Sequence, residues 1–338
     1  MAAAGDEQRR STGSIEAGND LPVGGQAVLE GVMMRGVSTW AVAVRLPAAE
    51  QLAGGRRTDP HEAARGAIEV RSFALVSVLT RHRWLRLPVV RGVVALGESL
   101  RLGIRALGIA ANAQSPADEK PISRATWIGT VALALALSVG LFFLLPVGLT
   151  SLVADRLPNS LVFVLVEKLV RITIFLAYLW AVSRMRALRR VFEYHGAEHK
   201  AISCYEAGLA LTPENAQRFS RLHPRCGTSF MLIVMVVAIV VFAPLGTPAW
   251  YWLFASRVIG IPLVAGLAFE VIKCFGRNRS KRWARALMAP GMKLQLLTTR
   301  EPDAGQLAVA IAALQVVLAV ETPGDAGDEE RVGMEVAA

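Results

Sequence analysis

The longest charge-free segment of the chain runs from Ala125 to Ala154, covers 30 residues and contains the run VALALALSVGLFFLL. About 20 consecutive apolar residues are enough for a helix to cross the hydrocarbon core of a bilayer. The composition agrees, because 53% of the residues are hydrophobic, 19% are charged and the mean hydropathy is +0.42. These values are shifted from those of soluble domains toward those of membrane proteins. The segment therefore predicts a transmembrane helix.

Further apolar segments follow it. A second charge-free stretch covers Cys226–Ser256, and VIGIPLVAGLAF follows after Arg257, so two helices that turn at PLGTPAW are the economical interpretation. Residues 160–183 are also long enough to span a bilayer. Three charged side chains interrupt that last segment: Glu167, Lys168 and Arg171. The sequence thus predicts an α-helical integral membrane protein with about four transmembrane helices.

Basic residues near the helix ends give the orientation. Segments 184–225 and 273–300 each carry eight Lys and Arg residues, whereas the loops DRLPNS and PLGTPAW together hold only Arg156. Basic residues are enriched in cytoplasmic loops. Both termini and the 184–225 segment are therefore expected in the cytoplasm, and the start of the chain lacks the apolar core of a signal peptide.

Charge and cysteine content indicate which binding partners and which redox compartment suit the chain. The chain has 37 Lys and Arg against 27 Asp and Glu, a formal charge of +10, with only 7% aromatic residues. Without aromatic stacking platforms, nucleic acid is not expected as a partner, and contacts with anionic lipid are expected instead. The three cysteines, Cys204, Cys226 and Cys274, cannot build a disulfide framework and fit a reducing compartment.

The chain is divided into five parts by composition. They are a disordered N-terminal tail (1–20), a cytoplasmic part with a β-hairpin or sheet and an amphipathic helix (21–124), a four-helix membrane region with a cytoplasmic loop at 184–227 (125–272), a cytoplasmic segment with a terminal helix (273–320) and a disordered acidic tail (321–338). The small β-containing layer is expected within residues 22–75 and the amphipathic helix at 84–113. In the C-terminal segment, residues 289–302 are expected to be extended, before a helix at 303–320.

The motif HGAEH in the 184–225 segment contains the candidate metal ligands and a candidate general base. His195 and His199 are four residues apart, so on a helix their rings project from one face and can share a metal ion. Glu198 lies on nearly the same face, as a third ligand, a partner of a ligand, or a general base for a water on the ion. The order H-x-x-E-H is that of the inverted zincins.

The residues after this motif extend the candidate site. Glu206 falls on the same helix face before Gly208 ends the helix, and a new helix starts at Thr212-Pro213. His223 and Cys226 are then returned to the same side of the membrane. Nitrogen and thiolate ligands together favour zinc over magnesium or calcium.

Several interpretations of this cluster stay open. The side chains can form a hydrogen-bonded structural network, or His195, His199, His223 and Cys226 can form a closed four-ligand metal site. The third interpretation is an open catalytic site with three ligands and Glu198 as base. A transporter is a further possibility and would depend instead on Glu167, Arg171 and Arg257.

The long motifs also carry a family resemblance. GGQAVLEGVMMRG at 24–36, YHGAEHKAISCYE at 194–206, HPRCGTSF at 223–230 and the segment 289–314 resemble the bacterial DUF1385 family of YqhQ-like membrane proteins, over roughly residues 22–320. The resemblance implies an uncharacterised membrane protein and a predicted metal-dependent enzyme, without naming a substrate. We expect this chain in the bacterial inner membrane. It implies family-motif positions at Gln26, Glu30, Arg35, His195, Glu198, His199, Glu206, His223 and Cys226.

The combined expectation is a metal-dependent hydrolase at the cytoplasmic membrane face. His195, His199 and His223 would hold a divalent, zinc-like ion, and Glu198 would act as the base. The GGQAVLEGVMMRG segment would close over the cluster, and Arg35 or Arg225 would hold an anionic substrate group. Further candidate site residues are Cys204, Glu206, Cys226, Gln26 and Glu30. A non-enzymatic scaffold or transport-associated protein is the alternative, and homo-oligomerisation stays open.

Overall fold

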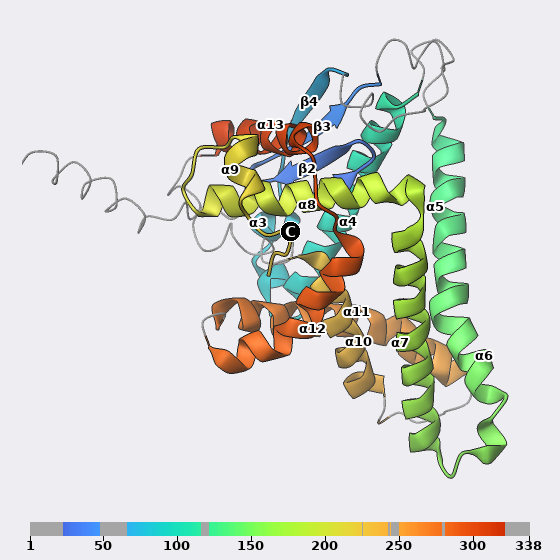
Figure 1. Cartoon of the computed structure of the whole chain (residues 1–338). Coiled ribbons are helices and arrows are strands. Elements are labelled where there is room, and N and C mark those ends of the chain that lie inside the picture. The colour runs from blue at the N-terminus through green and yellow to red at the C-terminus, as the bar shows by residue number, and fades with distance from the viewer. Residues whose placement is uncertain are drawn as a thin grey trace, which may run out of the picture.

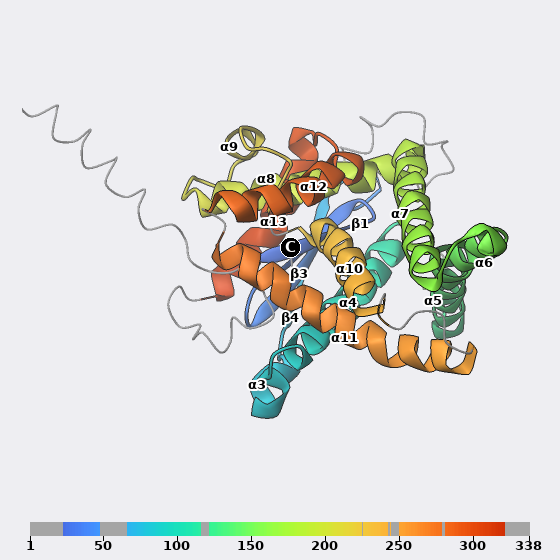
Figure 2. The same cartoon turned by 90° about the horizontal axis from the view of Figure 1, so that it is seen from below.

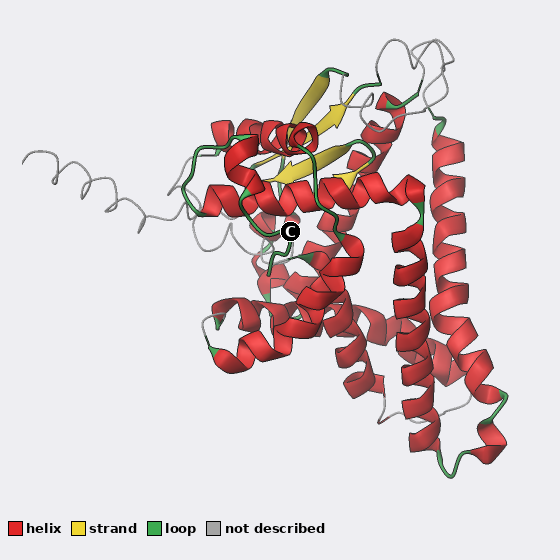
Figure 3. Ribbon diagram, viewed as in Figure 1, coloured by secondary structure: helices red, strands yellow, loops and turns green. Residues whose placement is uncertain are grey.

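The structure is a computed structural model and describes residues 23–47, 66–115, 122–224, 226–242, 244, 250–278 and 281–321. A small sheet and the helices around it form one part, and several long helices project away from it (Figures 1 and 3). The predicted tails lie outside the described residues except for Glu321.

The sheet is a four-stranded antiparallel meander with strand order β1-β2-β3-β4. Its strands are β1 (Gly24–Val28), β2 (Gly31–Arg35), β3 (Thr39–Arg45) and β4 (Ile68–Ala74). Successive side chains of a strand point to opposite faces, and every residue of β2 and β3 is buried. Both faces of these strands must therefore be covered.

Helices cover the two faces separately. The long helix α4 (Val90–Ala113) packs through Leu102 and Ala106 on the face that carries Met33 and Trp40. The opposite face, which includes Met34, packs against α8 (Arg186–Glu206) and α13 (Ala304–Val320). Asp303 and Gln306 begin α13 with a capping box, in which each side chain bonds the other's backbone N–H.

The projecting helices carry the apolar segments. Helix α5 (Arg124–Val139) continues through a π-helical turn (Gly140–Leu144) into α6 (Leu145–Ser151), and antiparallel to it runs α7 (Ser160–Arg184). Helices α10 (Gly227–Phe242) and α11 (Trp250–Arg277) pack against each other, and α10 also contacts α7 (Figure 2). Among the described residues, only the continuous helix Arg124–Ser151 is long and apolar enough to cross a membrane by length and composition. The four-span topology stays a prediction.

Helix α8 lies crosswise between the sheet and the projecting helices (Figure 1). Met185 takes an extended conformation between the end of α7 at Arg184 and the start of α8 at Arg186. The chain therefore turns sharply there, and the HGAEH motif runs along the boundary between the two parts.

Shorter elements complete the described chain: α3 (Val78–Arg81), a 3₁₀ turn (Arg83–Arg86), a second one (Ala154–Arg156), α9 (Pro213–Gln217) and α12 (Arg282–Thr298). Two sequence expectations are wrong here. Residues 289–298 are helical rather than extended, because Ala284, Gly291 and Leu294 form a buried stripe along α12 that holds the helix through Pro290. Glu321, expected in the disordered tail, is buried at 7% exposure, because its carboxylate accepts hydrogen bonds from Ser38 and Thr39.

Candidate functional site

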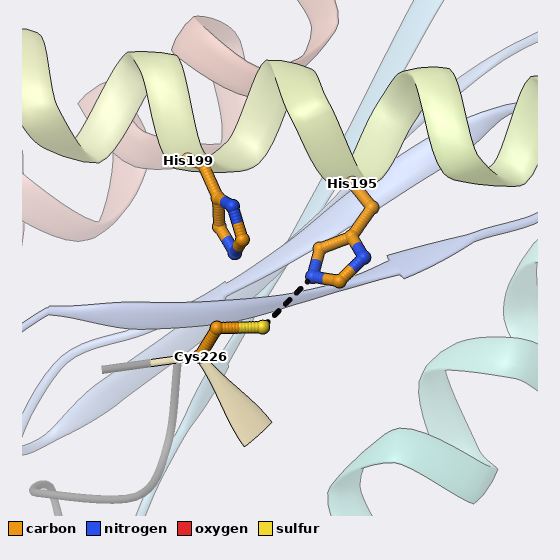
Figure 4. Close-up of side chains that lie close together, drawn as sticks. All are labelled: His195, His199 and Cys226. Atoms are coloured by element: carbon orange, nitrogen blue, oxygen red, sulfur yellow. Dashed lines mark hydrogen bonds between the residues drawn. The ribbon is translucent and has the colours of Figure 1, made fainter. Parts of the chain in front are cut away.

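Three potential metal ligands meet below α8. His195 and His199 project from one face of this helix toward Cys226, which directly precedes α10 (Figure 4). Their ligand atoms all lie within 4.8 Å of one another. His195 Nε2 is 3.3 Å from Cys226 Sγ, and the two imidazole centroids are 4.5 Å apart. The i, i+4 spacing predicted from the sequence brings the rings together as expected.

Backbone carbonyls fix both rings. His195 Nδ1 lies 2.8 Å from the carbonyl oxygen of Thr298, and His199 Nδ1 lies 2.6 Å from that of Arg221. A carbonyl only accepts, so each Nδ1 must carry the proton and donate it. Each Nε2 is then left with its lone pair facing the ligand group in the neutral ring. Metal-binding histidines characteristically have their other nitrogen anchored in this way.

The connection between α12 and α13 holds one of these anchors in place. Arg300 N donates to the carbonyl of Phe192 on α8 at 2.8 Å. Gly196 permits this approach, because a Cβ there would lie 2.1 Å from the carbonyl oxygen of Arg300. The glycine between the two histidines therefore lets the chain segment that carries Thr298 lie against α8.

Glu198 occupies a dry site beside the cluster. Its side chain is 1% exposed, and neither carboxylate oxygen has a hydrogen-bond partner among the described residues. Burial raises the pKa of this carboxyl to about 8, although the nearby His195 lowers it. The carboxyl group lies against β1, where a Cβ on Gly25 would come within 3.1 Å of its Cδ. Such a group holds a proton near neutral pH unless a cation sits close to it.

The side chains of His199 and Cys226 are also buried. Burial lowers the pKa of His199, whose Nε2 has no hydrogen-bond partner with good geometry in the described part of the chain. Burial raises the pKa of Cys226, but hydrogen bonding, including that with the Thr228 hydroxyl 3.2 Å from Sγ, outweighs it and lowers the pKa below the usual range. The thiolate form needed for metal binding is thereby favoured.

His223 does not join this group. Its Nε2 lies 3.3 Å from Glu206 Oε2, and Gln295 bonds both its backbone N–H, at 2.9 Å, and its carbonyl, at 2.8 Å. The ring stays near His199, with centroids 5.7 Å apart, but Cys226 takes the third ligand position expected for His223. The Gln295 side chain accounts for this difference, because it fixes the backbone of the loop at His223.

The polar residues of the GGQAVLEGVMMRG motif also lie elsewhere. Gln26 Nε2 donates to the carbonyl of Ser99 on α4 at 3.4 Å, and Arg35 Nη1 donates to the Ser99 hydroxyl at 3.2 Å. Glu30 accepts from Arg190 Nη2 at 2.6 Å. Strand alternation explains the difference, because Gln26 and Arg35 point to the α4 face and α8 covers the opposite face. The motif does reach the site, but through Gly25.

The remaining candidates are placed as follows. Cys204 is buried, its Sγ contacts the carbonyl of Ala210 at 3.6 Å, and burial raises its pKa, which is the environment of a packed structural thiol. Arg225 lies outside the described residues. The sequence patterns miss five residues that shape the site: Gly25, Gly196, Arg221, Gln295 and Thr298. Gly25 and Gly196 lie within motifs visible in the sequence, whereas the backbone carbonyls of Arg221 and Thr298 and the distant side chain of Gln295 leave no local signal.

The fold and the site define a class: a mainly helical protein with a small antiparallel sheet and a buried His/His/Cys group beside a buried glutamate. The chain belongs to the DUF1385 family, described as "Protein of unknown function", whose family model matches residues 87–320 and so includes His195, His199 and Cys226. It is 32% identical over 311 residues, 88% of this chain and 92% of the relative, to "Uncharacterized protein YqhQ" of Bacillus subtilis (strain 168). No solved structure matches significantly.

Proposed function

We propose that this protein is a metal-dependent hydrolase that acts at the cytoplasmic face of the bacterial inner membrane. One observation supports the proposal above all others: two imidazole Nε2 atoms and a thiol converge within 4.8 Å while both Nδ1 atoms are committed to backbone carbonyls. This arrangement presents three metal donors in fixed orientations before any ion binds.

The donor set fits a zinc-like ion. Imidazole and thiolate together are the ligands that zinc accepts and that magnesium or calcium does not prefer. Three protein ligands leave a fourth position for water or substrate, as in catalytic zinc sites. Two buried groups, His199 Nε2 and the Glu198 carboxyl, have no hydrogen-bond partner among the described residues. Such burial costs free energy in an apolar site, and a bound cation would offset this cost for both groups.

Each side chain has a distinct task in this proposal. A bound zinc-like ion would supply Lewis-acid activation of water and of a substrate oxygen. Glu198 would accept the proton of the attacking water and return it to the leaving group, and a bound cation would keep its carboxyl ionised until then. The carbonyls of Thr298 and Arg221 hold the rings, and Thr228 holds the Cys226 sulfur.

The surface of the projecting helices supports the membrane placement. The 18-residue window of highest hydropathy in Arg124–Ser151 contains no buried residue. Large apolar side chains are also exposed on α7, α10 and α11, where water is an unfavourable neighbour: Leu161, Leu165, Leu169, Val236, Val240, Trp252 and Ile259. The candidate site lies at the end of these helices that adjoins α8, whose segment carries the basic residues.

The first test is the metal content of the full-length protein purified in detergent without chelators. Wild type is expected to hold about one zinc-like ion per chain, and His195→Ala and Cys226→Ser should lose it because each removes one of three ligands. Cys274→Ser is the matched control, since Cys274 is exposed and is not one of the three ligands. His223→Ala should keep the ion. Wild type without metal, or Cys226→Ser with its metal, contradicts the proposal.

The Glu198→Gln variant separates an enzyme from a scaffold. It should keep its metal and lose hydrolysis of 4-nitrophenyl acetate by about 100-fold or more, because a general base contributes roughly that factor. In cobalt-substituted protein, acetohydroxamate should change the visible spectrum, since it binds at an open fourth position. A closed structural site would leave the spectrum unchanged, and full hydrolysis by Glu198→Gln would refute its role as base.

A further inference from the structure

A cavity of about 360 Å³ lies between α7, α10, α11 and the π-helical turn. Its lining is almost entirely apolar and includes Phe175, Met235 and Val264. Two cationic side chains, Lys168 and Arg171, complete it. None of the described residues of the candidate metal site lines this cavity. The metal site therefore does not explain why two cationic side chains lie in an apolar cavity.

Among the described residues, the charged cluster on the cavity wall holds two cations and one anion. Lys168 Nζ and Arg171 Nη2 both contact the same carboxylate, that of Glu167, so two cations share one anion. Glu167 and Lys168 are each 4% exposed. Arg171 Nε is buried and has no hydrogen-bond partner among the described residues, and its guanidinium lies over the Phe143 ring at 5.0 Å. An excess positive charge in an apolar site is costly unless an anion compensates it.

Lys168 and Arg171 lie nearer the start of α7 than its end. Lys168 is eight residues from Ser160 at the start of α7, about 12 Å along the helix, and about 24 Å from Arg184 and the junction with α8. The lining face of α10 extends from Phe230 to Phe242, about 18 Å. Met231 and Ile261 line the cavity and are each 46% exposed, so it reaches the apolar surface of the helices.

We propose that this cavity binds an acyl chain of an anionic phospholipid, with the lipid phosphate at Lys168 and Arg171. The apolar residues of α10 would contact the acyl chain, and the cationic side chains of Lys168 and Arg171 would contact the lipid phosphate. The exposed Met231 and Ile261 at the rim would let the lipid enter from the bilayer. The volume falls within the range of about 300–1,000 Å³ that is typical of ligand pockets. The proposal rests on the membrane placement argued above and is independent of the metal site.

Lipid competition tests this proposal on delipidated full-length protein in dodecyl maltoside. Binding of phosphatidylglycerol with a fluorescent acyl chain is followed by anisotropy, and unlabelled lipids compete. Phosphatidylglycerol should compete at least tenfold better than phosphatidylcholine with the same chains, and inorganic phosphate should not compete. Arg171→Gln should weaken binding about tenfold, since it removes one charge-assisted contact and leaves Glu167 paired with Lys168.

Matched variants separate binding from folding. Arg184→Gln removes the same charge from the same helix outside the cavity and should bind as wild type. Arg171→Lys should restore most of the affinity, and Ala238→Phe should exclude the chain by filling the cavity. Equal competition by both lipids, wild-type binding by a folded Arg171→Gln, or unchanged binding by Ala238→Phe overturns the proposal. The metal content of each variant should stay that of wild type, so failure here leaves the metal proposal standing.

Discussion

Gly196 supports the geometry of the His/His/Cys group although it is not one of the three residues. It permits the close approach of the chain segment whose Thr298 carbonyl anchors the His195 ring. We expect Gly196→Ala to destabilise the protein by roughly 1–3 kcal/mol, because its Cβ would lie 2.1 Å from the Arg300 carbonyl oxygen in a packed contact. The shift should also displace Thr298, which holds the His195 ring. Thermal unfolding and metal content measure the two effects.

Gly97→Ala is the matched control for this substitution. Gly97 lies in α4 and is exposed, and a Cβ at this position would have nothing within 4 Å, so alanine should stabilise the helix by about 0.5–1 kcal/mol. If the two variants unfold at the same temperature, the close approach at Gly196 does not limit stability.

At the level of single residues, the sequence predicts that the two histidines come together, but it does not decide whether His223 or Cys226 joins them. The i, i+4 spacing of His195 and His199 on a helix is sufficient to place both rings on one face. His223 and Cys226 are three residues apart outside regular structure, and no periodicity decides between them. Gln295, 72 residues after His223, makes that choice by binding its backbone, and such a distant contact leaves no local signal.

Among the elements, α13 shows how an apolar helix can form a core. Its composition alone resembles a short membrane segment, yet Leu307, Ala310 and Leu314 are fully buried against the sheet and α8. Its sequence start was identifiable from Asp303. Its end at Val320 also agrees with the expected helix at 303–320. The sequence did not indicate the hydrogen bonds of Glu321, which go to Ser38 and Thr39, 283 and 282 residues away in the chain.

Glu321→Gln tests whether this contact locks α13 to the sheet. The carboxylate accepts from the backbone N–H groups of Ser38 at 2.8 Å and Thr39 at 2.9 Å. Bonds to a charged acceptor contribute about 1.5–3 kcal/mol, so the neutral amide should lower the unfolding free energy by about 1–2 kcal/mol. Chemical denaturation in detergent measures the loss.

The control for this variant is Glu69→Gln in β4. Glu69 pairs with Arg71 at 2.6 Å on the surface, where such pairs contribute about 0–1 kcal/mol. The Glu321 variant should therefore unfold at a clearly lower denaturant concentration than the Glu69 variant. Coinciding unfolding curves would show that the end of α13 is not held by this carboxylate.

Two other elements show the limits of local patterns. The sequence predicted an extended segment at 289–302, whereas α12 continues through Pro290 although proline disfavours helix interiors. The helix forms in spite of the proline because Leu294 and Thr298, four residues apart, are both buried on one face of α12. In α7, Glu167 and Arg171 made the helix hard to recognise as a possible span, whereas their mutual contact in the structure explains how both are accommodated.

At the scale of the whole molecule, hydropathy predicts which helices are apolar but not which of them are covered. Both Arg124–Ser151 and Ala304–Val320 are strongly apolar, yet the first is exposed and the second lies in the core next to the sheet. Only packing separates them. The same packing sets α8 across the boundary, so the histidines of one helix meet a cysteine at the start of another.

This architecture predicts the sidedness of two thiol positions in sealed spheroplasts. Native Cys274 is exposed near the end of α11, in the basic segment 273–300, and should react with a membrane-impermeant maleimide only after permeabilisation. Pro158→Cys, in the exposed connection between α6 and α7, should react in intact spheroplasts when combined with Cys274→Ser. Cys204 and Cys226 are buried and should stay unlabelled in both conditions. Labelling of Cys274 from outside would invert the topology and place the His/His/Cys group on the opposite side of the membrane, where its proposed cytoplasmic reaction could not occur.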